Sequence, residues 1–171
     1  MSNPVFDNGE FARNRRTLQG ELKLADLPRI GGEVLAATPI GYALAGGIDR
    51  LQRPTLDLAL NGELQLKCQR CLKPVSFELD VATRFTLFAD EARMNAAEAD
   101  DEDLEGLLFE HEFALIGLIE DEILLSLPYA PAHDACEAGD GAAADAVATP
   151  QKPNPFAVLA DLKGKLKRGE H

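Results

Sequence analysis

The strongest constraint on the fold is an alternation of apolar and polar side chains over much of residues 41–88. A period of two places successive side chains on opposite faces of a β-strand. It predicts strands over residues 18–24, 41–49, 56–60, 63–68 and 75–88. Asn61-Gly62 is typical of a hairpin turn, and a second turn falls between Cys68 and Cys71. Consecutive strands joined by tight turns form an antiparallel meander.

Two segments are predicted to be helical. Over residues 112–127 apolar side chains recur at the spacing of one helix face, and Pro128 ends the helix. Over residues 154–168, Asn154 and Pro155 suit the N-cap and first helical position. We therefore predict an α+β fold: an antiparallel meander, or partly closed barrel, of five to seven strands, with one main helix packed on it and a short amphipathic C-terminal helix.

We expect a single folded domain with flexible segments at both ends. Residues 1–16 show little apolar pattern and are predicted to be a flexible arm, and residues 17–136 form the α+β domain. Within it, residues 90–105 are strongly acidic and are predicted to be a loop. Residues 137–153, rich in Ala, Gly and Asp, are predicted to be a disordered linker to the C-terminal helix.

The formal net charge of −12 restricts the partners of the chain. A field of this sign opposes contact with phosphate backbones, so RNA binding requires a segregated basic patch. Basic residues gather in the arm, beside the Cys68–Cys71 turn and in the C-terminal segment. They are Arg13, Arg15, Arg16, Arg70, Lys73, Lys163, Lys165 and Lys167. The alternative interpretation is an ordinary solvated surface.

The predicted main helix carries three consecutive acidic residues, Glu120, Asp121 and Glu122. Adjacent helical positions fan out around the axis, so these carboxylates do not converge on one substrate atom. This favours a solvated or partner-facing acidic edge over paired catalytic carboxylates.

Four candidate metal ligands occur in two pairs of equal spacing. Cys68 and Cys71 form one pair, and His133 and Cys136 form the other. Each pair has the spacing at which a knuckle directs two donors at one ion, and three thiolates with one imidazole suit tetrahedral zinc. The fold must bring the pairs together across residues 72–132, a longer gap than in compact zinc ribbons.

Two other interpretations of the Cys68–Cys71 pair remain. It could be a structural turn that presents a polar tip of Gln69, Arg70 and Lys73. It could also be a redox centre, but redox pairs lie at helix N-termini, where the helix dipole lowers the thiol pKa, and this pair lies in a predicted β-turn.

Other classes of protein are disfavoured. The sequence shows no phosphate-binding glycine loop and no pairing of a nucleophile with a base, so we expect no enzymatic activity and no small-molecule substrate. No signal peptide or membrane-length apolar run is present, and three cysteines do not suggest a secreted disulfide scaffold. We expect a cytoplasmic protein with reduced thiols and no membrane partner.

Four ordered blocks resemble the YceD family, the large ribosomal RNA subunit accumulation proteins of bacteria and plastids. They lie at residues 64–71, 119–128, 131–133 and 152–159, within a likeness that spans residues 10–165. The resemblance implies a cytoplasmic, non-enzymatic factor for accumulation or processing of 23S rRNA. It also implies that the functional candidates are Cys68, Gln69, Arg70, Cys71, Glu120, Asp121, Glu122, Asn154, Pro155 and Phe156. Spacing after the histidine varies in the family, so the resemblance does not extend to Cys136.

Two hypotheses of function follow. In the first, the arginines of the arm, the Cys68–Cys71 tip and the C-terminal lysines contact 23S rRNA or a pre-50S particle, while the acidic side contacts a ribosomal or rRNA-processing protein. In the second, the chain is an acidic adaptor for such a basic protein and has no direct RNA contact. A zinc-dependent or thiol-switch sensor is a third, weaker hypothesis.

Overall fold

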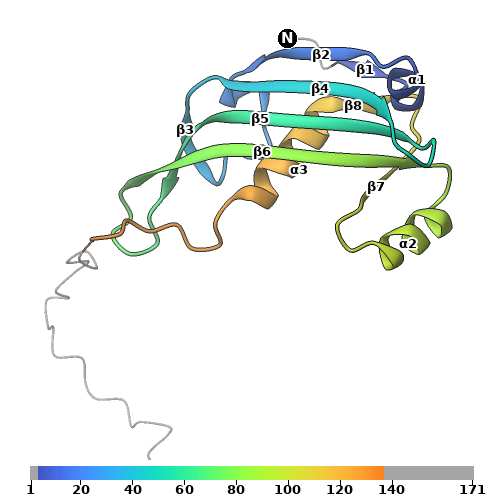
Figure 1. Ribbon diagram of the computed structural model, residues 1–171. Coiled ribbons are helices and arrows are strands. Elements are labelled where there is room, and N and C mark those ends of the chain that lie inside the picture. Colours follow the sequence, from blue (N-terminus) through green and yellow to red (C-terminus); the bar gives the residue numbers. More distant parts are fainter. Residues whose placement is uncertain (1–3, 137–171) are drawn as a thin grey trace, which may run out of the picture. The chain divides into compact units, whose positions relative to one another are not determined.

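The computed structural model describes residues 4–136, which form a curved β-sheet with a helix against one face (Figure 1). The predicted linker and C-terminal helix, with Phe156, Lys163, Lys165 and Lys167, lie outside the described residues. The elements are β1 (Val5–Phe6), α1 (Asn8–Arg13), β2 (Thr17–Leu22), a 3₁₀ turn (Leu24–Asp26), β3 (Val34–Ala37), β4 (Ile40–Ile48), β5 (Pro54–Lys67), β6 (Pro74–Phe88), α2 (Glu91–Asp100), β7 (Glu105–Leu108), β8 (Phe113–Ala114) and α3 (Leu115–Ser126).

The main sheet has the strand order β2-β4-β5-β6-β7, and β3 also pairs with β5. All pairs are antiparallel except β6–β7, which is parallel. A separate two-stranded sheet joins β1 to β8. The predicted α+β class with an antiparallel core is confirmed. The partly closed barrel is not: β2 and β7 form the two edges of the main sheet and do not pair with each other.

The predicted hairpin at Asn61-Gly62 is wrong. β5 runs straight through both residues, and neither has the positive φ that a tight hairpin turn of this type requires. The pair marks a change of neighbour instead. β4 pairs with β5 as far as Asn61, and β3 pairs with it from Leu64 onward. β4 and β3 therefore pair in succession with the longer strand β5. This pairing keeps β5 extended through Asn61-Gly62, where the local sequence favours a turn.

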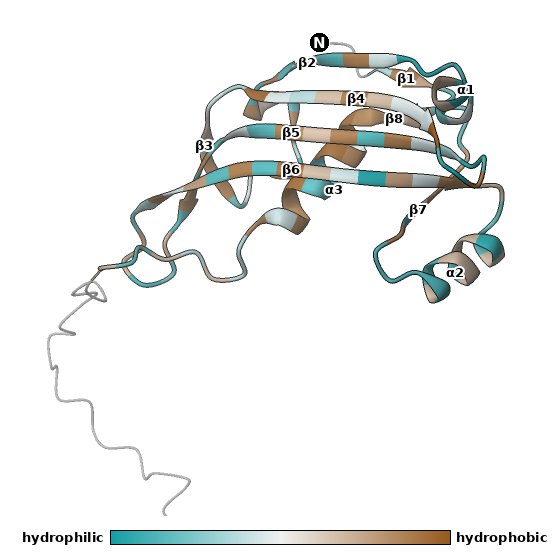
Figure 2. Cartoon of the chain, viewed as in Figure 1, coloured by the Kyte–Doolittle hydropathy of each residue, from teal (hydrophilic) through white to brown (hydrophobic). Residues whose placement is uncertain are grey.

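The core lies between the main sheet and α3. Hydropathy alternates along β5 and β6, and the apolar side of α3 faces the sheet (Figure 2). Leu115, Ile119 and Ile123 of α3 are fully buried with Leu58 and Leu60 of β5. Burial of such a side chain contributes about 1.5–3 kcal/mol. The predicted main helix is thus confirmed, with slightly narrower bounds than residues 112–127.

The prediction of a flexible arm over residues 1–16 is wrong for the described part of it. Phe11 and Ala12 of α1 are buried in the core. Asp7 caps the helix by accepting a hydrogen bond from the Glu10 backbone N–H at 2.6 Å. A six-residue helix with only two core residues gives too weak a periodicity to be recognised in the sequence.

The acidic stretch predicted as a loop at residues 90–105 contains α2. Asp90 caps this helix by accepting from the Arg93 N–H at 2.9 Å. None of its residues is buried, so the apolar periodicity that indicates a helix is missing. The capping residue was the signal that could have identified it. No helix in residues 4–136 is long and apolar enough to cross a membrane.

Truncation of the core should be costly in a way that a surface truncation is not. We predict that Ile119→Ala lowers the free energy of unfolding by about 2–5 kcal/mol, because it leaves a cavity between α3 and the sheet. Leu125→Ala in the same helix is the matched control, since Leu125 is 80% exposed. Urea denaturation measures both. Equal losses would contradict the assigned core face.

Candidate metal centre

The β5–β6 hairpin ends in a tight turn that carries Cys68 and Cys71. The Cys68 N–H donates to the carbonyl of Lys73 at 2.9 Å, and the Leu72 N–H donates to the carbonyl of Cys68 at 3.0 Å. Leu72 has a φ of 61°, which is uncommon for a residue other than glycine. This conformation lets the chain reverse within the turn.

The segment after α3 returns to the same hairpin tip. The backbone N–H of Gln69 donates to the carbonyl of Pro131 at 2.8 Å. Figure 1 shows this segment running beside the tip of the β5–β6 hairpin. This contact places His133 and Cys136, which follow Pro131 closely in the sequence, against the turn.

The four predicted ligands converge. The sulfur atoms of Cys68 and Cys136 are 3.7 Å apart, and the sulfur of Cys71 is 3.5 Å from Nδ1 of His133. All four ligand atoms lie within 4.8 Å of one another, so the cluster could hold a metal ion. Cys68 is buried and the other three are half-buried. The fold therefore closes the long gap between the two pairs.

A second hydrogen bond orients the histidine for coordination. His133 Nε2 lies 2.9 Å from the carbonyl oxygen of Pro74. A carbonyl can only accept, so Nε2 donates to it, and in the neutral ring Nδ1 then has the free lone pair, on the side of the Cys71 sulfur. Metal-bound histidines are commonly held by such a bond from the opposite ring nitrogen. The role of the Pro74 carbonyl has no signature in the sequence.

The turn also lowers the pKa of one of the four candidate ligands. Backbone N–H groups, above all that of Cys71, hydrogen-bond to the Cys68 sulfur and lower the pKa of its thiol to about 5. Burial has the opposite effect on Cys136 and raises the pKa of its thiol, and hydrogen bonding to Cys68 acts in the same direction. These opposite shifts favour the thiolate form at Cys68 and the neutral thiol at Cys136, so a cation that bound the cluster would have to displace a proton from Cys136.

The remaining predicted site residues lie elsewhere. Arg13, Arg15 and Arg16 are exposed at the end of α1. The Arg16 carbonyl accepts from the N–H of Gly46, which pairs with the start of β5. The hairpin tip lies twelve residues further along β5, about 40 Å away in an extended strand. These arginines and the metal ligands therefore belong to opposite ends of the sheet.

The three acidic residues of the expected edge on the main helix all contact other segments of the fold, and one of them is buried. Glu120 is buried and accepts from the Arg29 backbone N–H at 2.7 Å. Asp121 pairs with the Arg29 side chain at 2.7 Å, and Glu122 accepts from the Thr83 hydroxyl at 2.6 Å. Glu120 is thus not the solvated carboxylate that the sequence suggested. Its contacts join α3 to the segment between β2 and β3.

The fold and the cluster define an α+β protein with a candidate metal centre at a hairpin tip. The chain belongs to the YceD family: the family model "Large ribosomal RNA subunit accumulation protein YceD" matches residues 56–163, a range that includes all four ligands. A relative of that description from Haemophilus influenzae (strain ATCC 51907 / DSM 11121 / KW20 / Rd) is 38% identical over 114 residues. The match covers 60% of this chain and 62% of the relative, less than two thirds of its length. No solved structure matches the chain.

The lowered pKa of Cys68 should be visible as a thiolate at unusually low pH. We predict that thiolate absorbance near 240 nm of the chelator-treated protein rises with a midpoint near pH 5, the pKa of Cys68. Folding lowers this pKa, so its stabilising effect is complete above the ordinary value of 9.0 and is lost as the pH falls to about 5.

Two controls accompany this titration. In denaturant the midpoint should move toward the ordinary value, because the backbone hydrogen bonds are lost. Cys68→Ser should abolish the low-pH step. A native protein without any thiolate signal below neutral pH would show that the turn does not activate Cys68.

Proposed function

We propose that this chain is a non-catalytic factor of the bacterial cytoplasm, required for accumulation of 23S rRNA, and that it acts by binding the rRNA or a pre-50S particle. Membership of a family described by large ribosomal RNA subunit accumulation supports this role. The observation that carries the mechanism is the convergence of four ligands beneath an exposed polar turn.

We propose zinc as the ion. Tetrahedral zinc with Zn–S bonds of about 2.3 Å and Zn–N bonds of about 2.0–2.1 Å places two sulfurs about 3.8 Å apart and sulfur and nitrogen about 3.5–3.6 Å apart. The separations of 3.7 Å for Cys68–Cys136 and 3.5 Å for Cys71–His133 fit these values. Thiolate and imidazole donors also favour zinc over calcium or magnesium.

The ligands would hold the tip residues as a rigid binding loop. Gln69, Arg70 and Lys73 are exposed around the buried sulfur of Cys68. Arg70 and Lys73 form no ion pair within the described residues, so their charges are available to phosphate groups. Zinc knuckles are among the small modules that recognise single-stranded RNA. The local positive charge offsets the repulsion expected from the net charge of the whole chain.

The arginines of α1 provide a second basic group. Because they lie about 40 Å from the tip along β5, an RNA that contacts both groups must span roughly that length. Arg13 is held over the Phe109 ring, with its guanidinium carbon 5.1 Å from the ring centre. This packing keeps the charge at the surface in a defined position.

Loss of a ligand should remove the metal. We predict that purified full-length protein contains one zinc ion per chain by elemental analysis, and that His133→Ala lowers this content at least tenfold. His111→Ala is the matched control, because His111 is exposed and its side chain pairs with Asp7, away from the four candidate ligands. Equal zinc content in both variants would contradict the proposed site.

Loss of the tip charges should weaken RNA binding in a salt-dependent way. We predict that Arg70→Ala with Lys73→Ala reduces affinity for 23S rRNA fragments, and lowers the slope of log affinity against log salt by about 1.4–1.8, because two phosphate contacts are lost. The matched control is Arg93→Ala in α2, because the Arg93 side chain is exposed.

A second experiment, in cells, tests the role itself. Deletion of the gene for this chain should lower the 23S to 16S rRNA ratio, and the double variant should restore that ratio less than the Arg93→Ala control does. An unchanged ratio on deletion would refute the proposed role.

The acidic adaptor without direct RNA contact remains a second candidate. One observation favours it: the main sheet has an open face with several carboxylates that form no ion pairs within residues 4–136. If the wild-type protein shows no salt-dependent binding to 23S rRNA fragments, the adaptor hypothesis is favoured.

A further inference from the structure

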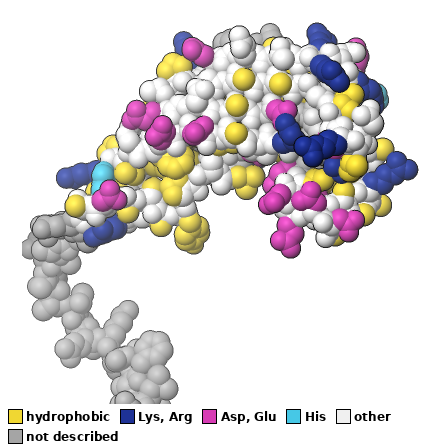
Figure 3. All heavy atoms as spheres, viewed as in Figure 1, with side chains coloured by type: hydrophobic (Ala, Val, Ile, Leu, Met, Phe, Trp, Pro, Cys, Tyr) yellow, Lys and Arg dark blue, Asp and Glu magenta, His cyan; other side chains and the backbone are white. Residues whose placement is uncertain are grey.

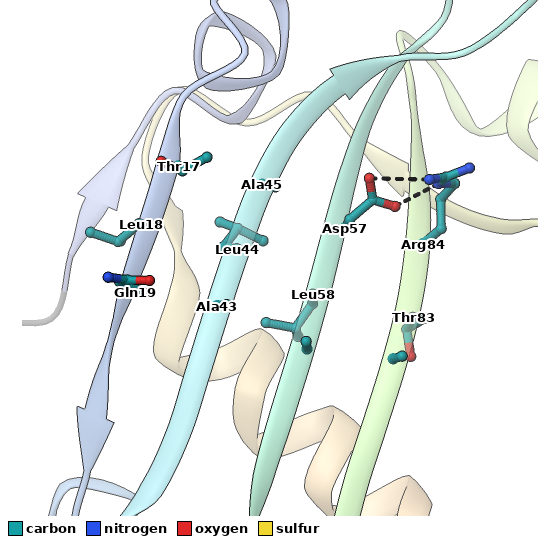
Figure 4. Close-up of a pocket in the computed structure, with 12 residues that line it drawn as sticks. Thr17, Leu18, Gln19, Ala43, Leu44, Ala45, Asp57, Leu58, Thr83 and Arg84 are labelled. Atoms are coloured by element: carbon teal, nitrogen blue, oxygen red, sulfur yellow. Dashed lines mark hydrogen bonds and ion pairs between the residues drawn. The ribbon is translucent and has the colours of Figure 1, made fainter.

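The face of β2, β4, β5 and β6 that points away from α3 contains a hollow of about 620 Å³. Figure 4 looks onto this face, with α3 behind the strands. Small side chains dominate its floor, and Thr17 and Gln19 of β2 lie along one side. At one end, Asp57 and Arg84 form an ion pair across β5 and β6.

The floor consists of alanines at exposed positions of central strands. Ala43, Ala59 and Ala82 are directly opposite one another in one row across β4, β5 and β6. Alanine is depleted in strands, and larger β-branched or aromatic residues in such a row would stabilise the sheet through cross-strand contacts. Local sheet stability therefore does not explain these alanines. Their effect is to leave room for another surface close to the backbone.

Carboxylates border the hollow on the side nearer the hairpin tip. Along β5 and β6, Asn61 faces Asp80, and Glu63 faces Glu78. Glu21 of β2 lies on the same face, opposite Gly41 of β4. Figure 3 shows acidic side chains toward the hairpin-tip end of this face, and both basic and acidic side chains toward the other end.

These carboxylates lack a cation within the described residues. Glu21, Glu63, Glu78 and Asp80 form no ion pair there, and Glu63 instead accepts hydrogen bonds from Gln65 and Ser76. Like charges directly opposite each other in a sheet are destabilising. A cationic partner would relieve the repulsion between Glu63 and Glu78, whereas RNA phosphates would increase it.

We propose that this face binds a lysine- and arginine-rich segment of a partner protein. Apolar atoms of the segment lie over the alanine row, and its cations reach Glu63, Glu78 and Asp80. The choice of partner rests on the proposed function: the partner is a basic protein associated with large-subunit rRNA. It places protein contact on the open sheet face, and RNA contact at the tip and the α1 arginines. The chain then holds a basic protein and RNA on separate surfaces.

Photocrosslinking in cells tests the surface directly. Benzoylphenylalanine replaces Gln19 at the rim of the hollow in the full-length chain, and in a matched strain replaces Ala96, an exposed residue of α2. We expect position 19 to crosslink to a protein whose attached peptide, sequenced by mass spectrometry, is rich in Lys and Arg, with at least tenfold less product from position 96. A crosslink to RNA, to a second copy of the chain or to an acidic peptide, or no crosslink, would overturn the inference.

Variants of the face provide the second readout. In the position-19 strain, Ala59→Gln with Ala82→Gln fills the hollow, and Glu78→Gln with Asp80→Asn removes two charges. Each pair should lower the crosslink yield at least tenfold. Glu91→Gln with Glu102→Gln, the same charge change at exposed positions outside the face, should not. Circular dichroism confirms that the variants are folded.

The same strains separate this inference from the proposed function. If the 23S to 16S ratio depends on the chain but the crosslink is insensitive to the face variants, only the inference fails. If the ratio does not depend on the chain, the proposed function fails, whatever the crosslink shows.

Discussion

The pairing of β5 with β6 is the interaction on which the rest of the structure depends. The register is continuous from Thr55 and Thr86 to Lys67 and Pro74, so every side chain along it has an assigned face. One face contacts α3 and forms the core. The other carries the alanine row and the carboxylates, and the end of the ladder carries the cysteine turn. A shift of one residue would exchange the two faces, so register determines core, surface and tip together.

Sequence patterns predicted those features that depend on short spacing. The two ligand pairs, the alternation in β5 and β6 and the helix ended by Pro128 were all recognisable, because each involves neighbours within a few residues. Features set by distant contacts were not. Asn61-Gly62 looked like a turn because the pairing of two strands with β5 is invisible locally, and Glu120 looked exposed because its partner, the Arg29 N–H, lies 91 residues away. The carboxylates bordering the hollow become a group only once strand register is known.

Charge is segregated over the surface of the described residues, although the chain as a whole is acidic. Exposed arginines lie at the end of α1, lysine and arginine lie beside the candidate metal ligands, and carboxylates occupy the open sheet face between these two ends. Salt screens charges over about 8–10 Å at physiological ionic strength, so the two basic groups, about 40 Å apart along β5, act independently of each other. The net charge of the chain therefore does not give the local charge of any one of these surfaces.

The hairpin tip also joins distant parts of the chain. Cys68 and Cys136 are 68 residues apart, and between them lie β6, α2, β7, β8 and α3. Closing a loop of this length costs on the order of 4 kcal/mol of chain entropy. An ion that links the two cysteines would remove much of that freedom from the unfolded chain, like a reversible disulfide suited to a reducing compartment. During synthesis all four candidate ligands are present only after α3 and the ten residues that follow it have been made.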